Sequence, residues 1–503
     1  MISGIKRFSL RHPLILLSTF FLFLRLPYLT KLPIFNDEAI YLDWGWRETH
    51  NPGFLFYSLY DAKQPLIMWA FGLSQELFSD TLLAGRLVSV LIGLLGALGL
   101  YKLLSQTINR QYALIGSLIY SLIPIFLFFD RQALMESAMV TVVFWGCFYT
   151  LEVIENQSFG SSAMLGVVYG LGFFSKSTAL LFFLVSLLII LYSFVKERKT
   201  ALTIRHLSLI LLVFLGVCLL LLIQPEFWAT LGSNSRYTLS LKELVNQSSL
   251  YWVDKASKNT LILFLSLTPI IVLTGIFGIY KSLKGKEDLL KRVVYIFAIT
   301  FFLQFLFSRF ATPRYLVTFM ALFTPFIIFG YKSLTENLKR VFLISLIMPV
   351  TISLLSITYP IQYLNLIGFG VDEGYTRGQT SGIGVKEAGY YVQSLTKGKR
   401  AFVAMALNAG NPESGIIDFF QKDELIKTGF MDSQGLGDLS SIECLKAPIP
   451  LYYLTRNEEI GEFARYFKKI KTIHQPSGGY SIGIYQLNTE CKGKSITLKT
   501  IKT

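Results

Sequence analysis

Long apolar segments dominate this sequence and restrict its fold more than any other feature. A helix that crosses a bilayer needs about 20 mostly apolar residues, and the sequence contains eleven candidate segments, of which the fifth is short. They lie at roughly 13–30, 82–104, 112–129, 137–151, 163–174, 178–195, 207–224, 260–280, 293–309, 315–331 and 341–359. The sequence therefore predicts an α-helical polytopic membrane protein with about eleven transmembrane helices.

The composition supports this class. The chain of 503 residues is 52% hydrophobic and only 16% charged, and its mean hydropathy is +0.51. Polytopic membrane proteins commonly have such values, whereas a soluble domain would not. The formal net charge of +15 fits basic cytoplasmic loops better than a nucleic-acid partner, which we do not expect.

Basic residues are concentrated in alternate loops, which predicts the orientation of the chain. The loops near 196–205, 281–292 and 332–340 are rich in Lys and Arg, as is the segment before the first span. Cytoplasmic loops carry this excess. We therefore expect a multi-pass protein of the cell membrane with a cytoplasmic N-terminus. With an odd number of spans, its C-terminal region lies on the extracytoplasmic side.

The expected domain organisation has two parts. Residues 1–359 form the transmembrane module, which includes an extracytoplasmic loop at 31–81, and residues 360–503 form an extracytoplasmic soluble α/β domain. In that domain we expect two helices, the second of them basic, and four strands. The helices are expected at 385–396 and about 458–470, and the strands at 400–406, 450–455, 471–474 and 480–487, with a turn at 476–479. Cys444 and Cys491 could form a disulfide there, but no feature of the sequence requires it.

An acidic pair, Asp37 and Glu38, follows the first apolar span. Charged groups at membrane depth are costly, so their presence there suggests a function. The pair could accept a proton, position an acceptor or hold a divalent cation such as Mg or Mn. The alternative is that both are solvated loop residues.

Basic residues also lie at the expected external ends of the spans, and one of these turns carries a further acid, Glu136. The bases are Lys63, Arg131, Lys176 and Arg314. Arg binds phosphate with two parallel hydrogen bonds and Lys binds it as a point charge, so the set suits a lipid-linked phosphate. For any one of these bases, anchoring of a helix end at the membrane surface is the simpler explanation.

Six short motifs, in their order along the chain, resemble the GT-C fold glycosyltransferases. They are RLPYLTKLPIFNDEAIY (25–41), KQPL (63–66), GRLVSV (85–90), RQALME (131–136), GFFSK (172–176) and RYLV (314–317). The most similar branch contains the bacterial relatives of the protein O-mannosyltransferases and the lipid A aminoarabinose transferase. The resemblance implies transfer of a sugar from a polyprenyl-phosphate donor on the extracytoplasmic face, usually with inversion.

The resemblance also implies roles for individual residues. Asp37 matches the first-loop acid that acts as general base or orients it, and Glu38 matches its neighbour. Glu136 stands where many relatives have Asp. The expected donor-phosphate residues are Lys63, Arg131, Lys176, Arg314 and Tyr315.

This sequence departs from the family pattern around the first-loop lysine. The usual Pro-Pro pair is Gln64-Pro65 here, and Ala62 replaces the acid that precedes the lysine in the aminoarabinose branch. The second departure puts a metal ligand carried over from that branch in doubt.

The expected partners are a polyprenyl-phosphate-linked sugar, membrane lipid, and an acceptor that is a lipid, a protein or a glycan. We expect no nucleotide cofactor, since the Gly-rich run at 381–389 lacks the spacing of a dinucleotide-binding turn. The alternative function is a membrane transporter, or a flippase for a lipid-linked saccharide. Transporters commonly contain inverted repeats, which we do not find in the sequence. A purely structural scaffold would leave the acids and bases unexplained.

Overall fold

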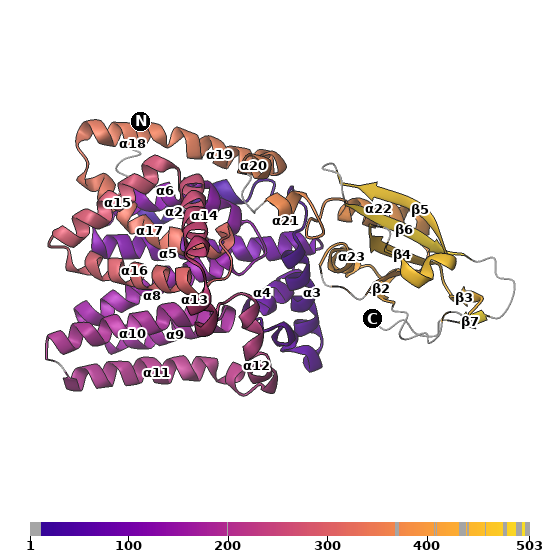
Figure 1. Ribbon diagram of the computed structural model, residues 1–503, viewed down its shortest axis with the longest axis horizontal. Helices are drawn as coiled ribbons and strands as arrows, with labels where there is room; N and C mark the ends of the chain where they lie inside the picture. Colours follow the sequence, from indigo (N-terminus) through magenta and orange to yellow (C-terminus); the bar gives the residue numbers. More distant parts are fainter. Residues whose placement is uncertain are drawn as a thin grey trace. The chain divides into compact units, whose positions relative to one another are not determined.

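The computed structural model describes residues 12–198, 200–367, 372–406, 408, 410–431, 439, 442–457, 459–475, 480–488 and 495–497. Two compact units account for the chain, and each is described by itself. The first comprises residues 1–29, 48–70 and 86–363, and the second comprises residues 30–47, 71–85 and 364–503. Helices make up the first unit, and a mixed sheet lies in the second (Figure 1).

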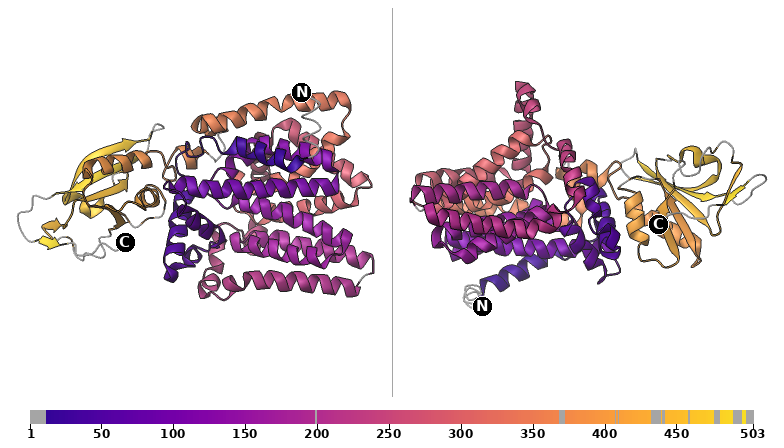
Figure 2. Two further views of the ribbon diagram at one scale, coloured as in Figure 1. Left: turned by 180° about the vertical axis from the view of Figure 1, so that it is seen from behind. Right: turned by 90° about the horizontal axis from the view of Figure 1, so that it is seen from below.

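The first unit is a bundle of apolar helices, several of which run side by side (Figure 2). Their bounds are α2 (Pro13–Arg25), α5 (Thr81–Thr107, of which 81–85 belong to the second unit), α6 (Arg110–Leu122), α7 (Pro124–Asp130), α8 (Glu136–Asn156), α9 (Phe159–Ser175), α10 (Ala179–Lys196), α11 (Thr200–Leu222), α14 (Ser249–Leu267), α15 (Pro269–Lys284), α16 (Asp288–Phe307), α17 (Pro313–Ser333), α18 (Glu336–Ser345) and α19 (Ile347–Thr358). Within the described part of the chain, seven helices are long and apolar enough to cross a membrane, or up to nine if each bent pair forms one span. The polytopic class is thus confirmed. Two of the expected spans, 13–30 and 163–174, correspond to the shorter apolar helices α2 and α9.

The expected span at 260–280 is not one straight helix. It is broken between α14 and α15, which meet at an angle of 108°. Thr268 at the break has φ +69°, and Pro269 begins the next helix. Proline has no N–H to donate and disfavours helical backbone at the preceding residue, which explains the break. A second bend of 72° separates α6 from α7 before Pro124.

Close helix packing in the first unit depends on small residues. A methyl group added at Gly278 of α15 would overlap the backbone carbonyl of Phe326 in α17. Gly330 of α17 lies equally close to the backbone of Thr274 in α15. Without water between the helices, such close packing is a main source of association in membranes.

Shorter helices connect the spans. The region 31–81 contains α3 (Asn36–His50), the 3₁₀ turns η1 (Pro52–Phe54) and η2 (Tyr57–Asp61), and α4 (Leu66–Gln75), an apolar helix that the sequence analysis did not identify. Between α11 and α14 lie α12 (Pro225–Ala229), η3 (Leu231–Arg236) and α13 (Leu241–Asn246), and α20 (Pro360–Ile367) and α21 (Asp372–Thr376) follow α19.

The second unit contains a five-stranded sheet of order β2-β1-β4-β6-β5. Its strands are β1 (Ala401–Met405), β2 (Ile426–Phe430), β4 (Leu451–Arg456), β5 (Phe467–His474) and β6 (Ser481–Leu487). Strand β1 pairs in parallel with β2 and β4, whereas β6 pairs antiparallel with β4 and β5. Helix α22 (Val385–Thr396) packs against β6, and α23 (Glu413–Phe420) packs against β2. The expected α/β architecture is therefore confirmed.

The prediction of a basic helix at about 458–470 is wrong. Over the described residues 459–470 the only helical element is the 3₁₀ turn η6 (Gly461–Arg465), and β5 begins at Phe467. The lysines of this stretch lie on the edge strand of the sheet, where Lys469 and Lys471 flank an irregularity in the pairing with β6. Charged side chains are common on edge strands because they discourage pairing with other chains.

Three of the four cysteines lie within the described residues. Cys444, in the short strand β3 (Cys444–Lys446), is disulfide-bonded, whereas Cys147 and Cys218 are free. Strand β3 pairs with β7 (Ser495–Thr497). Cys491 and the expected turn at 476–479 lie outside the described residues.

Candidate functional site

A carboxylate in the first unit binds two of the expected phosphate-binding bases. Glu136 begins α8, Lys176 directly follows α9, and Arg314 lies in the first turn of α17. The Glu136 Oε1 atom accepts a hydrogen bond of 2.9 Å from Lys176 Nζ and one of 2.7 Å from Arg314 Nε. The Glu136 side chain is 1% exposed, while Lys176 and Arg314 remain 21% and 23% exposed. One buried acid thus holds two partly accessible cations together.

Lys63 carries a third positive charge near this pair. The turn η2 ends at Asp61, and Ala62 follows it with a φ of +58°, which turns the chain just before Lys63. The side-chain oxygen of Gln64 then accepts a hydrogen bond of 3.2 Å from the backbone N–H of Ser177. This bond links the Lys63 turn to the Lys176 turn, so the residue that departs from the family's Pro-Pro pair has a structural role here.

The charges in this cluster act on one another. Burial lowers the pKa of Lys176, the positive charges of Arg314 and Lys63 lower it further, and the negative charge of Glu136 opposes them. Lys63, Lys176 and Arg314 outnumber Glu136, so the cluster carries excess positive charge. Such a cluster is suited to bind an anion.

Two tyrosines lie beside the cluster, and the sequence analysis identified only one of them. The Lys63 ammonium lies 4.7 Å from the centre of the Tyr237 ring, and that ring contacts Tyr315 at 6.5 Å between centroids. Tyr237 lies between η3 and α13, a segment tied to the Lys63 loop by an ion pair of 2.7 Å from Arg236 to Asp61. No motif marks Tyr237, because its part in the site depends on this long-range contact.

Arg131 lies apart from these contacts. Its guanidinium donates hydrogen bonds of 3.0 Å and 3.1 Å to the backbone carbonyls of Arg25 and Tyr28. These carbonyls lie at and just beyond the end of α2, where backbone acceptors lack partners within the helix. The neighbouring Arg25–Asp130 ion pair of 2.8 Å is also buried. This geometry favours a structural role for Arg131.

Asp37 and Glu38 occupy the first turn of α3, in the second unit. Glu38 is fully buried, and its Oε2 atom accepts a hydrogen bond of 3.0 Å from the backbone N–H of Phe35 at the start of the helix. Asp37 is half-buried, and its Oδ1 atom accepts a bond of 3.4 Å from the Asn36 amide. The two acids therefore have different environments, with Asp37 the more accessible. Among the described residues, no group of three or more His, Cys, Asp or Glu side chains could hold a metal ion.

Comparisons with known proteins support the expected class. Residues 62–223 match the family described as dolichyl-phosphate-mannose-protein mannosyltransferase. This segment includes Lys63, Glu136 and Lys176. The chain matches no curated protein sequence at a significant level.

Solved structures show the fold. ArnT from Cupriavidus metallidurans bound to undecaprenyl phosphate has a TM-score of 0.64 at 13% identity, covering 95% of this chain and 99% of that one. The same protein in the apo state has a TM-score of 0.60 at 12% identity, covering 96% and 98%. The expected GT-C fold, with its C-terminal domain, is confirmed over nearly the whole of both chains.

Proposed function

We propose that this chain is a membrane glycosyltransferase of the GT-C class that uses a polyprenyl-phosphate-linked sugar. It transfers the sugar on the extracytoplasmic face to an acceptor hydroxyl and inverts the anomeric configuration. The observation that carries the proposal is the cluster in which Glu136 binds both Lys176 and Arg314 while Lys63 lies nearby.

The cluster binds the donor phosphate in this proposal. A polyprenyl phosphate gains negative charge as the glycosidic bond breaks, and fixed cations stabilise that charge. Arg314 and Lys176 contact the phosphate oxygens, and Lys63 adds a third positive charge. Binding of undecaprenyl phosphate by ArnT, which shares this fold, supports the choice of ligand.

Glu136 acts as a positioning residue in this scheme. Its Oε1 atom already accepts hydrogen bonds from two bases, and the side chain is 1% exposed. A buried carboxylate with two cationic partners is a poor proton acceptor. Its role is to fix the bases in the geometry that the phosphate requires. Tyr237 and Tyr315 form an aromatic wall beside them.

Asp37 is the proposed general base. A carboxylate can accept the proton of the attacking hydroxyl, and attack opposite the leaving phosphate gives inversion. Asp37 is half-buried and thus more accessible than Glu38, which is fully buried and holds the Phe35 backbone. Glu38 therefore positions α3. The pair also remains the candidate site for a divalent cation, Mg or Mn, and loss of transfer with EDTA that Mg restores would support that role.

The alternative of a transporter or flippase predicts that the sugar stays on its lipid. Purified full-length protein in lipid nanodiscs should convert a polyprenyl-phosphate-linked mannose to free polyprenyl phosphate when an acceptor is present. A nucleotide sugar should not replace that donor. NMR of the product reports the anomeric configuration. Movement of intact donor across the bilayer without bond cleavage would contradict the proposal, and a retained configuration would refute the inverting mechanism.

A further inference from the structure

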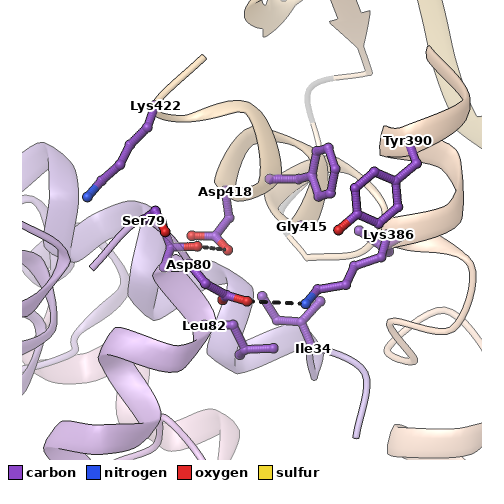
Figure 3. A pocket seen from close by; sticks show the side chains of 12 residues that line it. Ile34, Ser79, Asp80, Leu82, Lys386, Tyr390, Gly415, Asp418 and Lys422 are labelled. Carbon is purple, nitrogen blue, oxygen red and sulfur yellow. Dashed lines mark hydrogen bonds and ion pairs between the residues drawn. The ribbon is translucent and has the colours of Figure 1, made fainter. Parts of the chain in front are cut away.

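A cavity lies entirely within the second unit, and the proposed reaction does not use it. Its volume is about 210 Å³, and Figure 3 shows the side chains around it. We propose that this cavity binds one uncharged sugar ring of a glycan acceptor, a choice of acceptor that rests on the function proposed above. Apolar walls, a buried carboxylate with an unused oxygen and a balanced set of charges support the assignment.

The walls of the cavity combine apolar side chains with an accessible aromatic ring. Ile34, Leu82 and Val385 are almost fully buried and form its apolar part. Tyr390 of α22 is 60% exposed. Phe419 of α23 supports that ring at 5.0 Å with an interplanar angle of 89°. An exposed aromatic ring held by such a contact can cover the C–H surface of a sugar ring.

Asp418 supplies the polar anchor. It is 5% exposed, and its Oδ2 atom accepts a hydrogen bond of 2.6 Å from the Thr81 hydroxyl. Among the described residues, no donor reaches its other oxygen, Oδ1. A buried carboxylate oxygen without a donor is costly, so nearly all such groups in proteins have a partner. A ligand hydroxyl would provide the missing donor after a small adjustment of the surrounding side chains.

The charges around the cavity favour an uncharged ligand. Lys386 lies 3.4 Å from the Asp80 carboxylate, and both side chains are partly exposed. Lys422 points away from the cavity and donates to the backbone carbonyl of Phe78 at 2.6 Å (Figure 3). Two acids, Asp80 and Asp418, and two bases, Lys386 and Lys422, line the cavity. Their formal charges cancel when Lys422 is counted, so neither a phosphate nor an ammonium ion would find a net opposite charge. A sugar hydroxyl both donates and accepts, and can use Asp418 and Lys386 together.

The size of the cavity limits the ligand to a single ring. Pockets for drug-sized molecules have volumes of about 300–1,000 Å³, whereas this one has about 210 Å³. One monosaccharide of a longer glycan fits this description, with the rest of the glycan outside.

Binding of simple glycosides tests the proposal. The probes are methyl α-D-mannopyranoside, methyl α-D-glucopyranoside and methyl α-D-galactopyranoside, titrated against the full-length protein in nanodiscs and followed by saturation-transfer NMR. Nanodiscs avoid detergents with sugar headgroups, which would compete. At least one glycoside should bind, while cyclohexanol, a ring of similar size with one hydroxyl, should bind much more weakly.

Variants locate the binding. Asp418→Asn and Tyr390→Ala should each weaken binding about tenfold, as expected for the loss of one hydrogen bond to a charged group or of one aromatic contact. Tyr390 is exposed, so its substitution tests the proposal even if Asp418→Asn disturbs folding. Glu424→Gln, which removes a nearby exposed charge outside the cavity, should have no effect.

Several results would overturn the assignment. These are no binding of any glycoside, affinities unchanged in both cavity variants, or binding of inorganic phosphate or ethanolamine in place of the glycosides. Arg314→Ala separates this proposal from the proposed function. It should impair donor use but leave glycoside binding intact, so each proposal can fail without the other.

Discussion

At the residue scale, the central feature is one carboxylate oxygen shared by two cations. Glu136 Oε1 accepts from Lys176 and Arg314, which come from segments far apart in the sequence. The motifs around these residues could be recognised from the sequence, because each contains a charge at the end of an apolar span. The shared contact could not, because no local pattern records which turns meet. Tyr237 was missed for the same reason.

Replacement of Glu136 tests its positioning role. Glu136→Gln keeps the size of the side chain but removes the negative charge between two bases, which then repel each other. We expect donor KM to rise about tenfold or more, as for the loss of a charged hydrogen bond, with a smaller change in kcat. Steady-state transfer assays with varied donor measure both constants.

Two further variants distinguish a positioning residue from a proton acceptor. Glu136→Asp should recover part of the donor affinity, because an acid can still hold the bases. Glu155→Gln, an exposed change on the same helix, should resemble the unmodified protein. If Glu136→Gln lowers kcat alone and leaves donor KM unchanged, the positioning role is wrong.

Asp37 and Glu38 should differ in their effects on the reaction. Asp37→Asn preserves shape but cannot accept a proton, so transfer should fall about 100-fold or more while donor binding stays near normal. Glu38→Gln should be milder, since the amide oxygen can still accept from the Phe35 N–H. Single-turnover transfer and equilibrium donor binding are the measurements. Near-normal transfer by Asp37→Asn together with an inactive Glu38→Gln would reverse the two roles.

At the scale of elements, periodicity and apolar length predicted most helices and strands, and the errors have local causes. Helix α22 and strands β1, β4 and β6 lie where their apolar patterns placed them. The prediction of one continuous helix at 260–280 was wrong because Thr268-Pro269 interrupts an otherwise apolar run. Residues 467–470 were taken for the end of a basic helix, because their lysines resemble a solvated helical face, whereas the strand expected at 471–474 is the second half of β5. In the structure residues 467–470 also belong to β5, which pairs with β6. That pairing, between segments apart in the sequence, favours the strand over a helix.

Packing between α15 and α17 gives a prediction at this scale. Gly278→Ala places a methyl group against the Phe326 carbonyl, so the helices must separate. Overpacking of this kind costs about 1–3 kcal/mol, and we expect a clear fall in melting temperature in detergent. Gly216→Ala in α11, where nothing lies within 4 Å, is the matched control and should melt at or above the original temperature. Equal melting temperatures for the two variants would refute the packing argument.

At the scale of the whole molecule, the membrane class followed from composition, while the orientation is still a prediction. Positive charge in alternate loops predicts that the C-terminal end is extracytoplasmic. Alkaline phosphatase fused after Thr503 should be active, because it requires an oxidising compartment, and green fluorescent protein at the same position should be dark. The opposite pattern would place this end in the cytoplasm and contradict an odd number of spans.

The most direct test of the account is equilibrium binding of undecaprenyl phosphate to the purified protein. Lys176→Ala and Arg314→Ala should each weaken binding by about 10- to 100-fold, corresponding to 1.5–3 kcal/mol for a hydrogen bond to a charged group. Lys258→Ala, which removes an exposed lysine paired with Asp254 within α14, controls for general attraction between a basic protein and an anionic lipid. If all three variants bind the lipid phosphate as tightly as the unmodified protein does, the cluster around Glu136 is not the donor site.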